Sequence, residues 1–103
     1  MKSKLEKKLK GTDWQVGNAS DFLQLNPQEA AMVEIRLALA DAAKKARLQH
    51  DLSQTELAKL MRSSQSRVAK IEAADPSVSI DLMMHAMLAA GAKVKDVGRA
   101  LTA

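Results

Sequence analysis

Residues 53–72 read SQTELAKLMRSSQSRVAKIE. Ser53 followed by Glu56 three residues later forms a capping box, a pattern that marks the start of a helix. A second helix start follows at Ser64, only a few residues after the first apolar run ends. Between Glu56 and Glu72 the stretch carries four basic residues and no acidic one. We therefore expect two short helices, joined by a tight turn, that present positive charge.

The composition around this stretch favours a single small helical domain. The chain has 103 residues and is 47% hydrophobic, but only Trp14 and Phe22 are aromatic. The core must therefore be built from Leu, Ile, Val, Met and Ala, and four glycines and two prolines leave few interruptions. We predict an all-α fold, with an N-terminal arm and short helix in residues 1–25 and a domain that contains both short helices in residues 26–103.

Start and stop signals place the helices. Asn26-Pro27-Gln28-Glu29 combines a cap, a proline at the first helical position and an answering glutamate, so a helix is predicted over residues 27–49. Its apolar positions cover more than one stripe, which predicts two buried faces, one in the core of the domain and another against the N-terminal arm or a second chain. Other helices are predicted after Ser53, Ser64 and Ser79 and over residues 93–101, with core positions at Leu57, Leu60, Met61, Val68, Ile71, Leu82, Met83, Ala86, Met87 and Ala90.

Charge and cysteine content limit the kinds of site and the cellular compartment that we expect for this protein. The net charge is +4, and part of it lies in the lysine-rich residues 1–10, which form either a solvated end or a non-specific anchor for phosphate or lipid. No cysteine is present, so disulfides and thiolate metal sites are excluded. No apolar run reaches the roughly 20 residues of a membrane span, and no signal peptide is visible. We expect a cytoplasmic protein.

The exposed side of the second short helix has the chemistry of a base-reading surface. At about 100° per residue, Val68 and Ile71 mark its buried side. The opposite side offers amide, hydroxyl and cationic groups separated by small side chains, which suits the DNA major groove. The alternative is a polar face that only meets solvent. The exposed set is Ser66, Ala69, Lys70 and Ala73, flanked by Gln65 and Arg67.

This motif resembles the helix–turn–helix of the phage repressor and Cro family, also called the XRE family. The resemblance rests on LSQTELA at residues 52–58, SQSRV at residues 64–68 and Ile71-Glu72. It implies a five-helix, lambda-repressor-like DNA-binding domain covering roughly residues 34–101. It also implies double-stranded DNA as the partner and transcription regulation as the role.

The resemblance implies a task for each matching residue. Contacts to base edges are implied for Gln65, Ser66 and Lys70. A structural ion pair is implied between Arg47 and Glu72. Contacts to DNA phosphates are expected from Gln54, Arg62, Ser64 and Arg67.

Two positions depart from the family pattern. Arg62 occupies the turn position usually held by glycine, where a left-handed backbone costs about 1 kcal/mol for a residue with a Cβ. Either the turn keeps its usual shape at that cost or it is shaped differently. The loop at residues 74–77 has no basic residue, so a modest number of phosphate contacts is expected.

The N-terminal third has a looser likeness. Residues 14–47 resemble the segment that precedes the same domain in HigA-type antitoxins, which are often encoded beside a RelE-like toxin. The resemblance implies an antitoxin role in a toxin–antitoxin pair, with the toxin contacting the exposed surface of residues 12–40.

Other function classes are less favoured. No catalytic motif is visible, His50 and His85 are isolated, and we expect neither enzyme activity nor a cofactor or metal. RNA binding is disfavoured because no aromatic platform exists for stacking bases. The main alternative to a DNA reader is a protein-interaction module that binds a toxin or another partner.

A single helix–turn–helix unit covers few base pairs. We therefore predict a homodimer that reads a pseudo-palindromic operator with half-sites about one helical turn apart, and that represses a promoter by occupying it. Two surfaces are candidates for the dimer interface. One is the apolar surplus of residues 27–49, and the other is the last helix with Val94, Val97 and Leu101.

Overall fold

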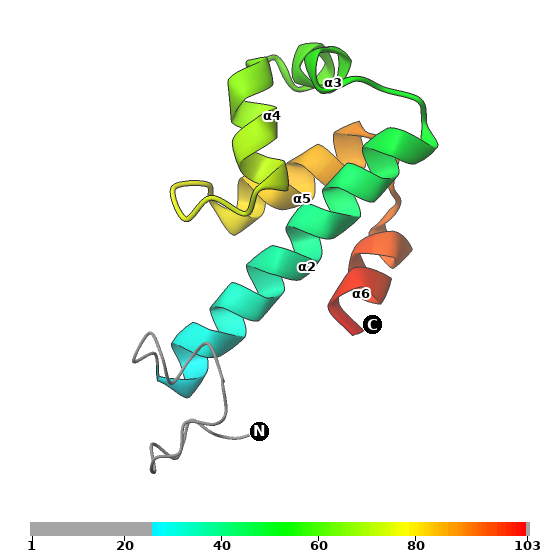
Figure 1. Cartoon of the computed structure of the whole chain (residues 1–103). Coiled ribbons are helices and arrows are strands. Elements are labelled where there is room, and N and C mark those ends of the chain that lie inside the picture. The colour runs from blue at the N-terminus through cyan, green and yellow to red at the C-terminus, as the bar shows by residue number, and fades with distance from the viewer. Residues whose placement is uncertain (1–25, 103) are drawn as a thin grey trace. The chain divides into compact units, whose positions relative to one another are not determined.

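The computed structural model describes residues 26–102, and every regular element in that range is a helix (Figure 1). The predicted all-α, five-helix class is confirmed for these residues. The arm and short helix predicted for residues 1–25 lie outside the described range. The helices are α2 (Pro27–Gln49), α3 (Gln54–Met61), α4 (Gln65–Glu72), α5 (Ile80–Ala89) and α6 (Val94–Thr102).

The chain divides into two units between Glu34 and Ile35, and of the first unit the structure describes residues 26–34. This part holds the start of α2, and the predicted cap is confirmed. The Glu29 backbone N–H donates to Asn26 Oδ1 at 2.7 Å, and the Asn26 N–H donates to Glu29 Oε1 at 3.0 Å. Two orphan donors of the first turn are thus satisfied by side chains.

The second unit contains the core that holds α3 and α4 in place. From α2 it buries one stripe, which includes Leu39 and Ala43, both fully buried. Among the described residues Leu37 of the same helix is 57% exposed, and the second predicted face, against the arm or a second chain, lies outside what these residues test. The half-buried Arg36 donates from Nη1 to the carbonyl of Val78, which ties α2 to the loop before α5. The remaining core residues are Ala40, Ala46, Leu57, Ala58, Met61, Val68, Ile71, Val78, Met83, Ala86, Met87 and Ala90.

The turn between α3 and α4 has a left-handed residue at its centre. Arg62 has φ 55° and ψ 47°, so the departure from glycine leaves the turn in the left-handed form. Its N–H donates to the carbonyl of Lys59 at 3.1 Å, and the Ser63 N–H donates to the carbonyl of Ala58 at 2.8 Å. These two bonds form a Schellman motif, which ends one helix and redirects the chain within a few residues. Ser64 then caps α4.

One predicted core position on α3 is wrong. Leu57 and Met61 are buried as expected, but Leu60 is 58% exposed. The buried side of this short helix also includes Ala58, which is part of the core and only 3% exposed. At about 100° per residue, a face centred between Leu57 and Ala58 turns Leu60 toward solvent. The helix therefore packs toward α4 and α5 on a face rotated from the one that its apolar residues predicted.

The last two helices follow the predicted signals. Ser79 caps α5 by accepting a hydrogen bond from the Leu82 N–H at 3.0 Å, and Gly91 ends it with φ 107°. The predicted core residues of α5 are buried, with Leu82 only partly so. By contrast, α6 contacts α5 but contributes no buried residue, and its Val94 is 81% exposed. No helix in the described range is long and apolar enough to cross a membrane.

Candidate nucleic-acid interface

The exposed face of α4 is set by which of its residues enter the core. Val68 and Ile71 are fully buried, so the opposite side of the helix must face solvent. Of the three side chains implied as base contacts, Ser66 and Lys70 are exposed on that side, and Gln65 is exposed on its flank. Their groups provide an amide, a hydroxyl and an ammonium on one short stretch of helix. This set matches the donors and acceptors on base edges in a major groove.

Ser64 positions the start of α4. Its hydroxyl oxygen accepts a hydrogen bond from the Arg67 backbone N–H at 3.2 Å and lies 3.2 Å from the hydroxyl oxygen of Ser66. The side chain is therefore a helix cap first, and a phosphate contact from it must coexist with these two partners. The Arg67 side chain is exposed.

Gln54 lies between two helices instead of pointing only outward. Its Nε2 donates to Glu72 Oε1 at 3.1 Å, and its Oε1 accepts from Gln65 Nε2 at 2.6 Å. The sequence assigned Gln54 to a phosphate and Gln65 to a base, and their mutual contact was missed. A signal was present, because each residue opens its own helix and a tight turn brings those two helices together.

A buried ion pair holds the other end of α4. Arg47 Nε lies 2.6 Å from Glu72 Oε2, and Arg47 Nη2 donates to Glu72 Oε1 at 3.1 Å. A third bond runs from Arg47 Nη1 to the carbonyl of Leu52 at 2.8 Å. The two side chains are only 10% and 5% exposed, so neither reaches the surface of α4.

This arrangement has an electrostatic consequence. The hydrogen bonds that Arg47 donates to the Glu72 carboxylate raise the pKa of Arg47 above its ordinary value, although burial acts in the opposite direction. Because Nη1 donates to the carbonyl of Leu52, all three nitrogens of the guanidinium group form hydrogen bonds. The ion pair thus connects the end of α2, the chain before α3 and the end of α4.

A polar hollow of about 350 Å³ lies beside α4. Two cations, Arg67 and Lys70, and three hydroxyl groups contribute to its wall, and α5 closes it on the apolar side. The hydroxyl of Ser77 is a polar group of this loop that the sequence analysis did not predict for the site, because hydroxyl groups are common on any surface loop. It donates to Asp75 Oδ1 at 2.7 Å, and the Ser77 backbone N–H donates to the same oxygen at 2.8 Å. These two hydrogen bonds lower the pKa of Asp75. The lining residues are Ser64, Ser66, Arg67, Lys70, Ser77, Val78 and Leu82.

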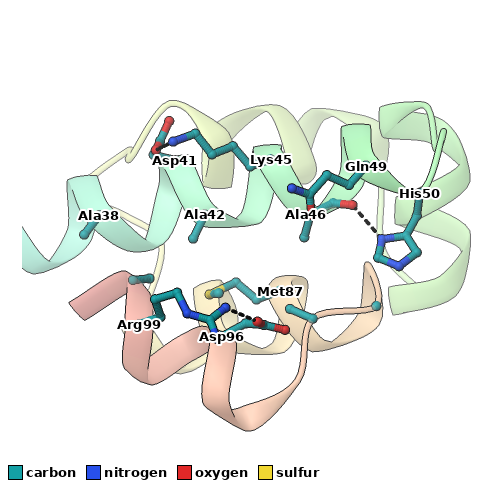
Figure 2. A pocket seen from close by; sticks show the side chains of 13 residues that line it. Ala38, Asp41, Ala42, Lys45, Ala46, Gln49, His50, Met87, Asp96 and Arg99 are labelled. Carbon is teal, nitrogen blue, oxygen red and sulfur yellow. Dashed lines mark hydrogen bonds and ion pairs between the residues drawn. The ribbon is translucent and has the colours of Figure 1, made fainter. Parts of the chain in front are cut away.

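A second hollow, of about 430 Å³, lies between α2, the end of α5 and α6 (Figure 2). Its charged side chains are paired: Lys45 with Asp41 at 2.9 Å, and Arg99 with Asp96 at 2.9 Å. His50 Nδ1 donates to the carbonyl of Ala46 at 2.9 Å. Within residues 26–102, no three His, Asp or Glu side chains gather as a metal site. The charged groups of this hollow therefore pair with one another.

Comparison with known proteins gives a family match for the middle of the chain. Residues 44–84 match the model of a family described as Helix-turn-helix, HTH_3. The matched range begins in α2, ends in α5 and contains α3, the turn and α4. No curated protein and no solved structure gives a significant match to the chain. The family match supports a DNA-binding transcription regulator of the XRE type.

Proposed function

We propose that this protein is a sequence-specific repressor that places α4 in the major groove of double-stranded DNA. The observation that carries the proposal is the exposure of Ser66 and Lys70 on the side of α4 opposite the fully buried Val68 and Ile71, with Gln65 exposed on the flank. Bases are read by these three residues, and the backbone is held by phosphate contacts. The phosphate contacts come from Gln54, Arg62, Ser64 and Arg67.

The experiment that tests this proposal compares a base contact with a phosphate contact. A preferred sequence is first selected from random duplex oligonucleotides and then mutated one base pair at a time. Gln65→Ala should cost about 1–3 kcal/mol on the preferred duplex and relax preference at one base pair. Arg67→Ala should weaken binding to all duplexes alike and reduce the salt slope by about 1. Equal binding of the wild type to selected and random duplexes would reject the proposal.

The protein-interaction module is distinguished by the same variants. Such a module would tolerate changes at Gln65, Ser66 and Lys70, because none of these residues is needed in the core. Thermal unfolding of the variants serves as the control, since exposed substitutions usually change stability by no more than about 0.5 kcal/mol. Loss of duplex discrimination without loss of stability supports the DNA reader.

The proposed assembly is a homodimer on a pseudo-palindromic operator, with α6 as the contact between copies. α6 favours this role over α2 because it contributes no fully buried residue to the core, and its Val94 and Leu101 are 81% and 44% exposed. A Cβ built on Gly98 of the same helix meets nothing within 4 Å, which leaves room for close approach. A twofold dimer would present two α4 helices about 34–36 Å apart along the duplex.

An antitoxin role is the finer form of the proposal. It relies on the likeness of residues 14–47 to HigA-type antitoxins, and within the described part of that range Met32 and Val33 are more than 40% exposed. Such apolar exposure suits a protein partner. Co-expression with a RelE-like protein encoded in the neighbouring gene tests this role. Suppression of growth arrest supports it, and unchanged arrest in the presence of soluble protein contradicts it.

A further inference from the structure

The hollow between α2, the end of α5 and α6 has the size of a small-molecule site (Figure 2). Its volume of about 430 Å³ lies within the range of about 300–1,000 Å³ that is typical of ligand pockets. Its lining residues come from α2, α5, α6 and the short segments that follow α2 and α5. The hollow is therefore a second candidate site, separate from the face of α4 and independent of the proposed contact with DNA.

Small apolar side chains form the inner wall of this hollow. Ala38, Ala42 and Ala46 are spaced four residues apart, so they lie on one side of α2 and form an alanine row. Met87 of α5 and Ala100 of α6 also line the hollow. Ala46 and Met87 are buried, so the inner end of the hollow reaches the core. The short alanine side chains leave space for an apolar group of a ligand, which is stabilised there by leaving water.

Two ion pairs lie on opposite walls of the hollow, one on α2 and one on α6 (Figure 2). Lys45 Nζ lies 2.9 Å from Asp41 Oδ2, and Arg99 Nη1 lies 2.9 Å from Asp96 Oδ1. The two cationic side chains are 70% and 68% exposed. Exposed pairs contribute little to stability, so their members can exchange partners with charges on a ligand. Each wall thus offers one positive and one negative group, and the charges of these four groups sum to zero.

We propose that this hollow binds an α-amino acid with an apolar side chain as a small-molecule ligand. The apolar side chain contacts the alanine row and Met87, and the two charged groups of the ligand pair with the walls. A carboxylate alone would bring unbalanced negative charge to Asp41 and Asp96, and an ammonium alone would bring unbalanced positive charge to Lys45 and Arg99. A zwitterion matches both signs and brings no net charge, so it complements this neutral set of groups.

A second copy of the chain is a poorer occupant of the hollow. Asp96, Arg99 and Ala100 line the hollow from one side of α6. At about 100° per residue, Val94 and Leu101 lie on the opposite side of the same helix. The proposed contact between copies uses Val94 and Leu101, so the hollow stays open to a small molecule in that dimer.

The first test compares ligands that share one side chain and differ in charge. Chemical-shift titration of the isotope-labelled full chain measures their affinities. L-leucine should bind with a dissociation constant of about 1 mM or lower. N-acetyl-L-leucine, which keeps only the carboxylate, and L-leucine amide, which keeps only the ammonium, should each bind at least about tenfold more weakly because a charged contact is lost. Glycine should be weakened to a similar extent because it lacks the apolar side chain.

The second test changes the hollow. Ala42→Leu should fill part of the space and weaken L-leucine binding at least about tenfold, since Ala42 is half-buried beside it. Ala31→Leu makes the same change at an exposed position of α2 outside the hollow and should leave the affinity unchanged. Arg99→Gln should weaken L-leucine binding about tenfold. Lys44→Gln, which removes an exposed cation outside the hollow, should not.

The outcomes distinguish the candidate occupants. Weaker L-leucine binding in Ala42→Leu and Arg99→Gln, with both controls unchanged, supports the site. Equal affinities for L-leucine and its two charge-blocked analogues, or no shifts at about 10 mM L-leucine, overturn the proposal. Conversion of a ligand-free dimer to a monomer by Ala42→Leu in sedimentation equilibrium overturns it too, because a second copy then covers the hollow. If Ala42→Leu does not fold, Arg99→Gln decides, since an exposed substitution leaves the core intact.

Discussion

The imidazole ring of His50 lies directly against the backbone of Gly91. A Cβ added to Gly91 would come within 2.7 Å of ring atoms Cε1 and Nε2 of His50. The ring is held in place because its Nδ1 donates to the carbonyl of Ala46 at 2.9 Å. The glycine thus has two reasons to be at this position: the close approach of the ring and its own φ of 107°.

Gly91→Ala should therefore destabilise the fold by about 1–3 kcal/mol, because the new Cβ meets both backbone strain and the ring. Gly98→Ala is the matched control, since its Cβ has open space within α6. In a helix interior that change should stabilise by about 0.5–1 kcal/mol. Urea unfolding measures both. Equal effects of the two substitutions would contradict the assigned role of Gly91.

Arg62→Gly should have opposite effects on folding and on DNA binding. The left-handed backbone at φ 55° is unfavourable for arginine, so glycine should stabilise the fold by about 1 kcal/mol. Loss of the exposed cation should weaken binding to all duplexes alike and lower the salt slope. Thermal unfolding and fluorescence anisotropy measure the two effects.

Arg62→Ala separates these contributions. It removes the charge but keeps a Cβ, so binding should fall as in Arg62→Gly, while stability should not rise. A gain in stability with alanine equal to that with glycine would show that the arginine side chain, and not the backbone, was the unfavourable element.

Acid should weaken the start of α3 through Glu56. The backbone N–H of Ser53, followed by its hydroxyl, lowers the pKa of Glu56 below its ordinary value of 4.5. A carboxyl with a lowered pKa in the folded state contributes stability above its unfolded pKa and loses that contribution as pH falls through the folded pKa. Glu56→Gln removes this titration. The difference in melting temperature between wild type and Glu56→Gln should therefore shrink between about pH 6 and about pH 3, and a constant difference would contradict the assignment.

Val94→Glu should convert the proposed dimer to a monomer without unfolding it. The side chain is 81% exposed, so a carboxylate there affects the contact between copies far more than the core. Sedimentation equilibrium should show the monomer, and affinity for a two-half-site duplex should fall by about a hundredfold or more as linked binding is lost. Leu60→Glu on α3, 58% exposed, is the control that should stay dimeric. A dimer that persists in Val94→Glu places the interface elsewhere.

The sequence predicted the helix starts because their determinants are local. Each of four helix caps accepts a hydrogen bond from the backbone N–H three residues later, and a pattern over three residues can be seen directly in the sequence. The caps are Asn26, Ser53, Ser64 and Ser79. The burial of Val68 and Ile71 follows from the period of the helix in the same way.

How the helices contact one another was harder to predict from the sequence. The exposure of Leu60 depends on the direction in which α3 packs, and an eight-residue helix does not fix that direction by its own pattern. The contact between Gln54 and Gln65 depends on the angle that the Arg62 turn imposes on two helix starts. The spacing of residues within one helix determines neither the packing direction of α3 nor the angle between the two helices, so both could be seen only in the packed structure.

The contact of Gln54 with Gln65 also bears on any redesign of α4. Its outward positions are interleaved with the buried Val68 and Ile71, so new side chains there can be sampled without disturbing the interior. A library that varies position 65 alone, however, keeps a neighbour suited only to an incoming NH₂ donor. Retargeting this helix to another nucleotide therefore means randomising positions 54 and 65 as a coupled pair.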